Sequence, residues 1–141
     1  MIWNLQIKLL EGAWADGDWQ ATVALDEATT LEDLHGLIQR VVGFDNDHLY
    51  SFFVARTPRS WDRVVYDEEE EANVPWEVPL NSLFPLGKHR KLFYLFDYGD
   101  NWVFQVSRTR HKPYEAEPGA EYPKVIAEQG DKPVQYPALE E

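Results

Sequence analysis

Two groups of acidic side chains and one histidine are the residues in this chain whose types and spacing could do chemistry. Asp97 and Asp100 lie three positions apart around Gly99, inside the otherwise apolar segment that runs from Leu92 to Val106. Aspartates so placed can accept backbone amide hydrogen bonds across a turn, while the glycine takes the left-handed backbone conformation. The local pattern therefore predicts a hairpin turn that both carboxylates fasten.

The same carboxylates could instead bind a hard divalent cation through their oxygens, provided that further ligands approach them. The segment Phe44–Tyr50 offers Asp45, Asp47 and His48. A histidine among several carboxylates can hold a metal ion or transfer a proton. The plainer alternative is that His48 caps a strand edge and that the two aspartates are solvated. The candidate metal ligands are Asp47, His48, Asp97 and Asp100.

No other recognisable catalytic pattern accompanies this cluster. The chain contains no phosphate-binding loop, no nucleophile elbow and no zincin helix motif, and it has no cysteine for a thiol nucleophile or a disulfide. Only three residues, His48, Asp97 and Asp100, are therefore candidates for catalysis, and we lean towards a protein that is not an enzyme. The candidate binding residues are Asp47, His48, Tyr50, Asp97, Asp100 and Trp102.

The chain has 141 residues and a net charge of −12, which would repel a phosphate backbone at long range. Two short basic clusters, Gly87–Lys91 and Arg108–Lys112, would favour nucleic-acid binding only if they converge in space. The first ten residues do not resemble a secretory signal, and no apolar run approaches the ~18 residues of a membrane span. We expect a cytoplasmic protein that does not enter a membrane.

These residues must be positioned by strands and one helix. Apolar residues alternate at 3–9 and at 19–25, which predicts an antiparallel hairpin with a long connection at Glu11–Asp18. Thr30 is a typical helix N-cap, an apolar stripe follows at helical spacing, and Gly43 ends the helix. A third strand is predicted at His48–Arg56, and a second hairpin at 91–97 and 101–108.

The remaining segments are predicted to be less regular. The acidic run within Tyr66–Pro75 indicates a solvated loop, and Val78–Pro85 indicates a short helical turn. The proline-rich segment 113–141 is expected to be extended, apart from one strand within Tyr122–Glu128. We therefore predict an α+β fold: a mixed, mainly antiparallel sheet of about five strands with one main helix packed on it and a β-grasp-like β-β-α opening. Residues 1–141 should form a single domain.

Three stretches together resemble the plasmid pRiA4b Orf-three-like family. They are Thr29–Val54, with a capped helix before an aspartate-rich loop, the segment Leu92–Val106, and the stretch YPKVIAEQGDKPVQYP near the end. The most specific element is the Asp-x-Gly-Asp-x-Trp pattern formed by Asp97, Gly99, Asp100 and Trp102. The resemblance implies a bacterial or archaeal α+β domain, often encoded near mobile elements and without a settled activity.

Two departures from the family pattern remove potential metal ligands. Many relatives have a histidine where this chain has Phe104, and many have a Cys-Pro-Pro-Glu-Asp tail where this chain has only GDKPVQYP. Both departures argue against a metal site here. We expect no cofactor, with a divalent cation as the alternative.

The leading hypothesis is a non-enzymatic domain that binds an unidentified protein or peptide. It rests on the net acidity and on three tryptophans predicted to lie in loops, Trp14, Trp61 and Trp76, since exposed apolar groups among polar ones mark partner surfaces. The first alternative is a metal-dependent hydrolase or nuclease that uses the Asp/His cluster. The second is a nucleic-acid-associated protein of mobile elements, which the net charge disfavours.

Overall fold

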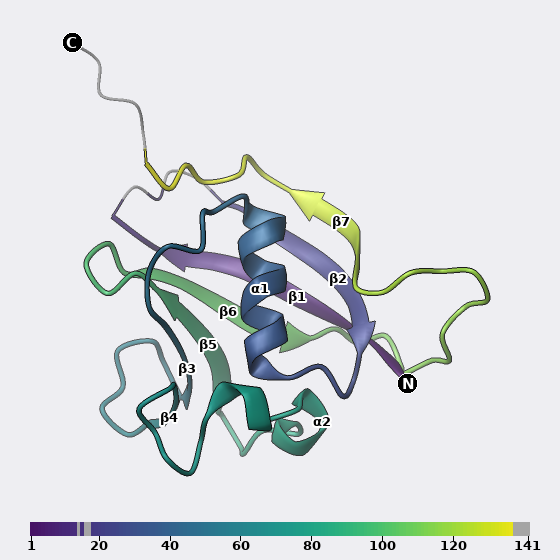
Figure 1. Cartoon of the computed structure of the whole chain (residues 1–141), viewed down its shortest axis with the longest axis horizontal. Helices are drawn as coiled ribbons and strands as arrows, with labels where there is room; N and C mark the ends of the chain where they lie inside the picture. The colour runs from purple at the N-terminus through teal and green to yellow at the C-terminus, as the bar shows by residue number, and fades with distance from the viewer. Residues whose placement is uncertain (14, 16–17, 137–141) are drawn as a thin grey trace.

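The computed structural model describes residues 1–13, 15 and 18–136. One seven-stranded sheet forms its centre, with the strand order β4-β3-β5-β6-β1-β2-β7. The helix α1 lies across one face of this sheet, and β4 and β7 form its two edges (Figure 1). The strands are β1 (Ile2–Glu11), β2 (Gln20–Asp26), β3 (Tyr50–Ala55), β4 (Val64–Tyr66), β5 (Lys91–Phe96), β6 (Trp102–Arg108) and β7 (Lys124–Gln129).

The predicted fold class was wrong in two respects. The sheet has seven strands, where about five were expected, and every pairing between its strands is antiparallel, where a mixed, β-grasp-like sheet was expected. The edge strand β4 has three residues, which is too short to show an alternating pattern. All six residues of β7 are exposed, so its pattern gave no sign that it pairs with β2 as part of the sheet.

The helix α1 (Leu31–Val42) forms as its sequence predicts. The Thr30 hydroxyl accepts a hydrogen bond from the amide of Asp33 at 3.2 Å, and Gly43 ends the helix with a φ of +81°. Its apolar stripe is buried against aromatic side chains of the sheet. Two short pieces follow later in the chain, a 3₁₀ turn η1 (Pro75–Glu77) and the one-turn helix α2 (Leu80–Leu83).

Both predicted hairpins are present, and β3 joins the second one. β1 pairs with β2, β5 pairs with β6, and β3 pairs with β5 in a register that sets Tyr50 opposite Phe96. This register brings the segment before β3 to the turn after β5, where Asp97 lies. Within the described residues, no helix has the length and apolarity needed to span a bilayer.

Candidate functional site

The turn between β5 and β6 is fastened by one carboxylate. Oδ1 of Asp97 accepts hydrogen bonds from the amides of Gly99 at 3.1 Å and Asp100 at 3.3 Å. The backbone is left-handed at Asp97, with a φ of +61°, and at Asn101, with a φ of +53°. The sequence analysis had assigned the left-handed position to Gly99. Aspartate and asparagine tolerate this conformation better than other side chains do. The carboxylate of Asp100 accepts no such bond from the described residues, so only half of the predicted turn chemistry is present.

The second oxygen of the Asp97 carboxylate faces His48. Nε2 of His48 lies 3.3 Å from Oδ2 of Asp97, 3.7 Å from Oδ1 of Asp47 and 2.6 Å from the hydroxyl oxygen of Tyr136. The Tyr136 hydroxyl in turn donates to Oδ2 of Asp47 at 2.8 Å. Because the Tyr136 hydroxyl donates its only hydrogen to Asp47, its oxygen can only accept a hydrogen bond from His48. The donor is then Nε2 of His48, so the proton of the neutral imidazole lies on Nε2.

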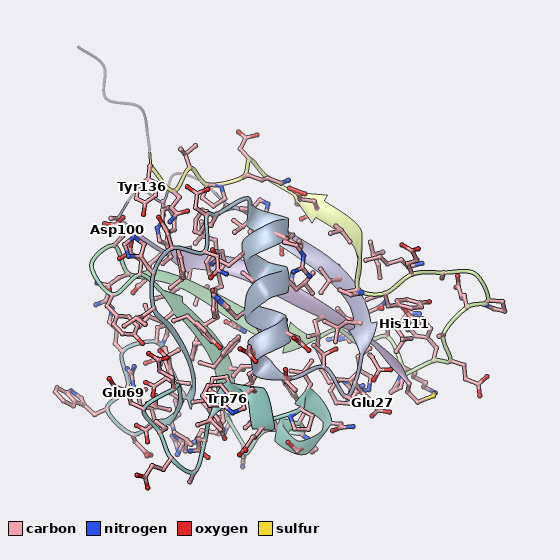
Figure 2. The ribbon with its side chains drawn as sticks, viewed as in Figure 1. Glu27, Glu69, Trp76, Asp100, His111 and Tyr136 are labelled. Carbon is pink, nitrogen blue, oxygen red and sulfur yellow. The ribbon has the colours of Figure 1, made fainter. Side chains whose placement is uncertain are left out.

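The hydrogen bonds of Tyr136 determine how the neighbouring carboxyl titrates. Two hydrogen bonds hold the pKa of Asp47 below its ordinary value, the one from the Tyr136 hydroxyl being the larger cause and the one from the Gln135 amide the smaller. The same bond from Tyr136 to the Asp47 carboxylate raises the pKa of Tyr136 to about 12. Gln135 also donates to Asp47 and accepts from the amide of Asp45 at 2.7 Å. Figure 2 shows Tyr136 and Asp100 at the same end of the molecule, so the last described residues lie against this site.

A buried polar network holds the loop that carries Asp47 and His48. Nε2 of Gln39 donates to the hydroxyl of Tyr94 at 2.9 Å, and its Oε1 accepts from the amide of Asn46 at 2.9 Å. His35 lies between that hydroxyl and the Asn46 side chain, with Nε2 2.7 Å from Oδ1. Burial lowers the pKa of His35, so the ring is neutral and bridges the helix to the loop.

Beside this network lies a surface cavity of about 180 Å³, which we call the acidic cavity. Its carboxylates are Glu32 from the first turn of α1 and Glu68 from the loop after β4. Its aromatic walls are Tyr50 and Trp76, and His48 closes the end nearest Asp97. Trp76 is 48% exposed and lies near the N-terminal end of α1 (Figure 2).

The two carboxylates of the acidic cavity act on the titration of its Tyr50 wall. The pKa of Tyr50 is raised to about 12, first by burial and then by the charges of Glu32 and Glu68. Neither glutamate forms an ion pair with a lysine or arginine in the part of the chain that the structure describes. A cation entering the cavity would therefore meet two carboxylates that are free to pair with it.

The structure brings together some of the residues that the sequence singled out and separates others. His48 contacts both Asp47 and Asp97, because the pairing of β3 with β5 brings the segment before β3 to the turn after β5. Trp102 is fully buried in the core, where the centre of its ring lies 4.9 Å from that of Phe44. It therefore packs inside the fold and is not a binding residue on the surface. Trp14 lies outside the described residues. Among the described residues, no three His, Asp or Glu side chains are arranged to hold a metal ion.

The sequence analysis did not find several residues of this site. Glu68 belongs to the acidic run that the sequence correctly assigned to a solvated loop, and Tyr136 belongs to the proline-rich tail. His35 and Gln39 could have been found, because two polar residues four positions apart on the apolar stripe of a helix indicate a buried hydrogen-bond network. Only the tertiary structure shows that these residues converge.

The fold and site define a small antiparallel α+β protein with an acidic, aromatic-lined cavity next to an Asp/His turn. The chain belongs to the family described as plasmid pRiA4b ORF-3-like protein, whose match covers residues 16–135. A crystal structure of a protein of unknown function from Methanosarcina mazei Go1 has a similar fold, with a TM-score of 0.72. The two sequences are 23% identical, and the alignment covers 90% of this chain and 68% of the other. No curated protein matches the chain in sequence.

Proposed function

We propose that this protein is a non-enzymatic binding domain of a cytoplasmic protein, and that its acidic cavity receives one lysine or arginine side chain of a protein partner. The observation that carries this proposal is the composition of the cavity, whose lining combines the carboxylates Glu32 and Glu68 with the aromatic residues Tyr50 and Trp76. Carboxylates pair with a cationic head group, and aromatic faces attract the same cation through their quadrupole.

The size of the cavity favours a single side chain over a free small molecule. Its volume of about 180 Å³ is below the range of roughly 300–1,000 Å³ that is usual for small-molecule sites. A lysine or arginine projecting from a partner needs only its own volume, and the net charge of −12 would steer a basic partner towards this protein.

The Nε2 atom of His48 is engaged within the protein, since it is hydrogen-bonded to Tyr136 and lies 3.3 Å from Oδ2 of Asp97. The hydrolase hypothesis predicted that Asp47 and His48 would lie near Asp97 or Asp100, and Asp97 does meet that condition. The hydrolase hypothesis also needs a metal ion shared by these side chains. It stays a prediction, and calorimetry with Mg²⁺ or Mn²⁺ would test it.

The proposal is tested with a pair of short peptides that differ only in charge. One carries a single arginine flanked by glycine and serine, and the other carries citrulline in its place. We expect the arginine peptide to bind measurably by calorimetry at low salt, and the citrulline peptide to bind at least about tenfold more weakly, since it loses the charge-assisted hydrogen bonds.

Matched variants locate the binding within the cavity. Glu68→Gln and Trp76→Ala should each weaken the arginine peptide by about five- to tenfold. Glu69→Gln removes the same charge from the neighbouring residue outside the cavity and should change binding by less than about twofold, because exposed charges at a distance are screened. Equal affinity for both peptides, or equal loss in the Glu68 and Glu69 variants, would contradict the proposal.

A further inference from the structure

A second cavity, which we call the basic cavity, lies at the other end of the β5–β6 hairpin. It has a volume of about 320 Å³. Its apolar lining includes Phe84, Pro85 and Leu86, which follow α2. Lys91 begins β5, whereas Asp97 follows its last residue, so the two cavities are separated by the length of that strand.

The basic cavity forms where the two basic clusters of the sequence meet. The antiparallel register of β5 and β6 pairs Leu92 with Val106. The residues just before Leu92 therefore lie beside those just after Val106, which brings Arg90 next to Arg108, while the side chains of Lys91 and Ser107 point to the opposite face of the sheet. The clusters are 17 or more positions apart along the chain, and their convergence is a consequence of the strand pairing.

The cationic group of Arg108 is available to an anion. Arg108 forms no ion pair with a carboxylate within residues 1–13, 15 and 18–136. The guanidinium of Arg108 lies 3.9 Å from the centre of the Trp3 ring, which fixes its position without neutralising it. Arg90 does pair with Asp62 at 2.8 Å, and the Asp62 side chain is largely exposed.

We propose that the basic cavity binds a small organic anion, in which a carboxylate or phosphate group is attached to an apolar body such as an aromatic ring. The anionic group would contact Arg108, whose side chain lies on the same face of the sheet as Phe84 and Leu86. The apolar body would pack against Phe84 and Leu86. A volume of about 320 Å³ lies within the range of roughly 300–1,000 Å³ that is typical of small-molecule sites.

A small anion fits this cavity better than a nucleic-acid strand does. Each phosphate of a polyanion adds to the repulsion from a protein of net charge −12, whereas an anion with one or two charges is repelled only weakly. The apolar lining gains little free energy from contact with a polar sugar-phosphate backbone, whereas burying an aromatic ring against it is favourable.

The experiment follows backbone amide chemical shifts by NMR during titration with four probes of matched size or charge. Phenyl phosphate and benzoate carry both required parts, benzyl alcohol lacks the charge, and inorganic phosphate lacks the apolar body. We expect saturable shifts at Ser107 and Arg108 with the first two probes, and at least about tenfold weaker binding of the other two. Benzyl alcohol binding as tightly as benzoate would overturn the proposal, and so would phosphate binding as tightly as phenyl phosphate.

Two variants separate the cavity from the general basic surface. Arg108→Gln should weaken phenyl phosphate about five- to tenfold through loss of a charge-assisted contact. Arg110→Gln removes an equal charge from the same cluster but not from the cavity lining, and should have less than about a twofold effect. Equal losses in both variants, or an oligothymidylate that binds more tightly than phenyl phosphate, would show a diffuse polyanion surface and overturn the proposal.

Discussion

Nε2 of His48 lies 3.3 Å from Oδ2 of Asp97, although the two residues are 49 positions apart in the sequence. The Asp97 side chain is largely buried and uses its other oxygen to accept two amides of its own turn. One carboxylate therefore fastens the β5–β6 turn and also receives the loop that leads into β3. This double use makes Asp97 the residue on which the geometry of the site depends.

Replacing Asp97 should destabilise the protein more than replacing Asp100. Asp97→Ala removes the acceptor of two amides and leaves alanine at a φ of +61°, so we expect a loss of about 2–4 kcal/mol in the free energy of unfolding. Asp97→Asn keeps an acceptor oxygen and tolerates this φ, and should lose less than half of that. Asp100→Ala should change stability by less than about 0.5 kcal/mol. Urea denaturation compares the three variants, and an Asp100 variant as unstable as Asp97→Ala would contradict this assignment.

Removing the Tyr136 hydroxyl should raise the pKa of Asp47. In the native protein the hydrogen bond from Tyr136 is the main reason why that pKa lies below its ordinary value of 3.8. Tyr136→Phe deletes this bond, so the pKa of the carboxyl should move back towards 3.8, as followed by the carboxyl carbon shift in an NMR pH titration. Tyr122→Phe, which changes a tyrosine with no contact to Asp47, is the control and should leave the titration curve in place.

Stability should fall as the pH drops below about 6.5 because of His35. Burial lowers the pKa of this histidine in the folded protein, so the unfolded chain, with a pKa near 6.5, binds more protons as the pH decreases. The penalty grows from pH 6.5 down to the lowered pKa of the folded state. His35→Gln cannot take up this proton and should show a flatter stability profile between pH 7 and 5, measured by denaturant unfolding. A variant profile as steep as the native one would refute this origin.

Asp47 affects the stability of the fold at a lower pH than the one at which His35 begins to act. Its pKa is lowered in the folded protein, so its contribution to stability is present above the ordinary value of 3.8 and is lost as the pH falls through the folded pKa. The contribution of Asp47 is therefore constant between pH 7 and 5, and this interval reports His35 without interference from this carboxylate.

Gly12 should not tolerate a side chain. A Cβ at this position would lie 2.4 Å from Cε3 of the Trp102 ring, which is fully buried and cannot move aside. Gly12→Ala is therefore expected to destabilise the protein by about 1–3 kcal/mol in thermal or urea unfolding. Gly36→Ala is the matched control, because its Cβ would meet only the flexible end of Arg40 at 3.4 Å, and alanine there should stabilise α1 by up to about 1 kcal/mol.

The sequence predicted the local elements well because their signals are local. The cap at Thr30, the stop at Gly43 and the spacing of the apolar stripe specify α1 without reference to the rest of the chain. The two hairpins followed from alternating apolar residues in the same way. For the candidate site, this local pattern was enough to select the Asp97 turn and the loop containing Asp47 and His48.

The sequence by itself therefore determined the helix, the two hairpins and the turn at Asp97, since each depends on residues a few positions apart. Only the tertiary structure decided that β4 and β7 extend the sheet to seven strands, because their pairing partners are distant in sequence. It also decided which charges meet. The antiparallel pairing of β5 with β3 and β6 places His48 at one end of the hairpin and Arg108 at the other. The apolar periodicity of each strand specifies which of its faces is buried, but it does not specify which distant strand pairs with it.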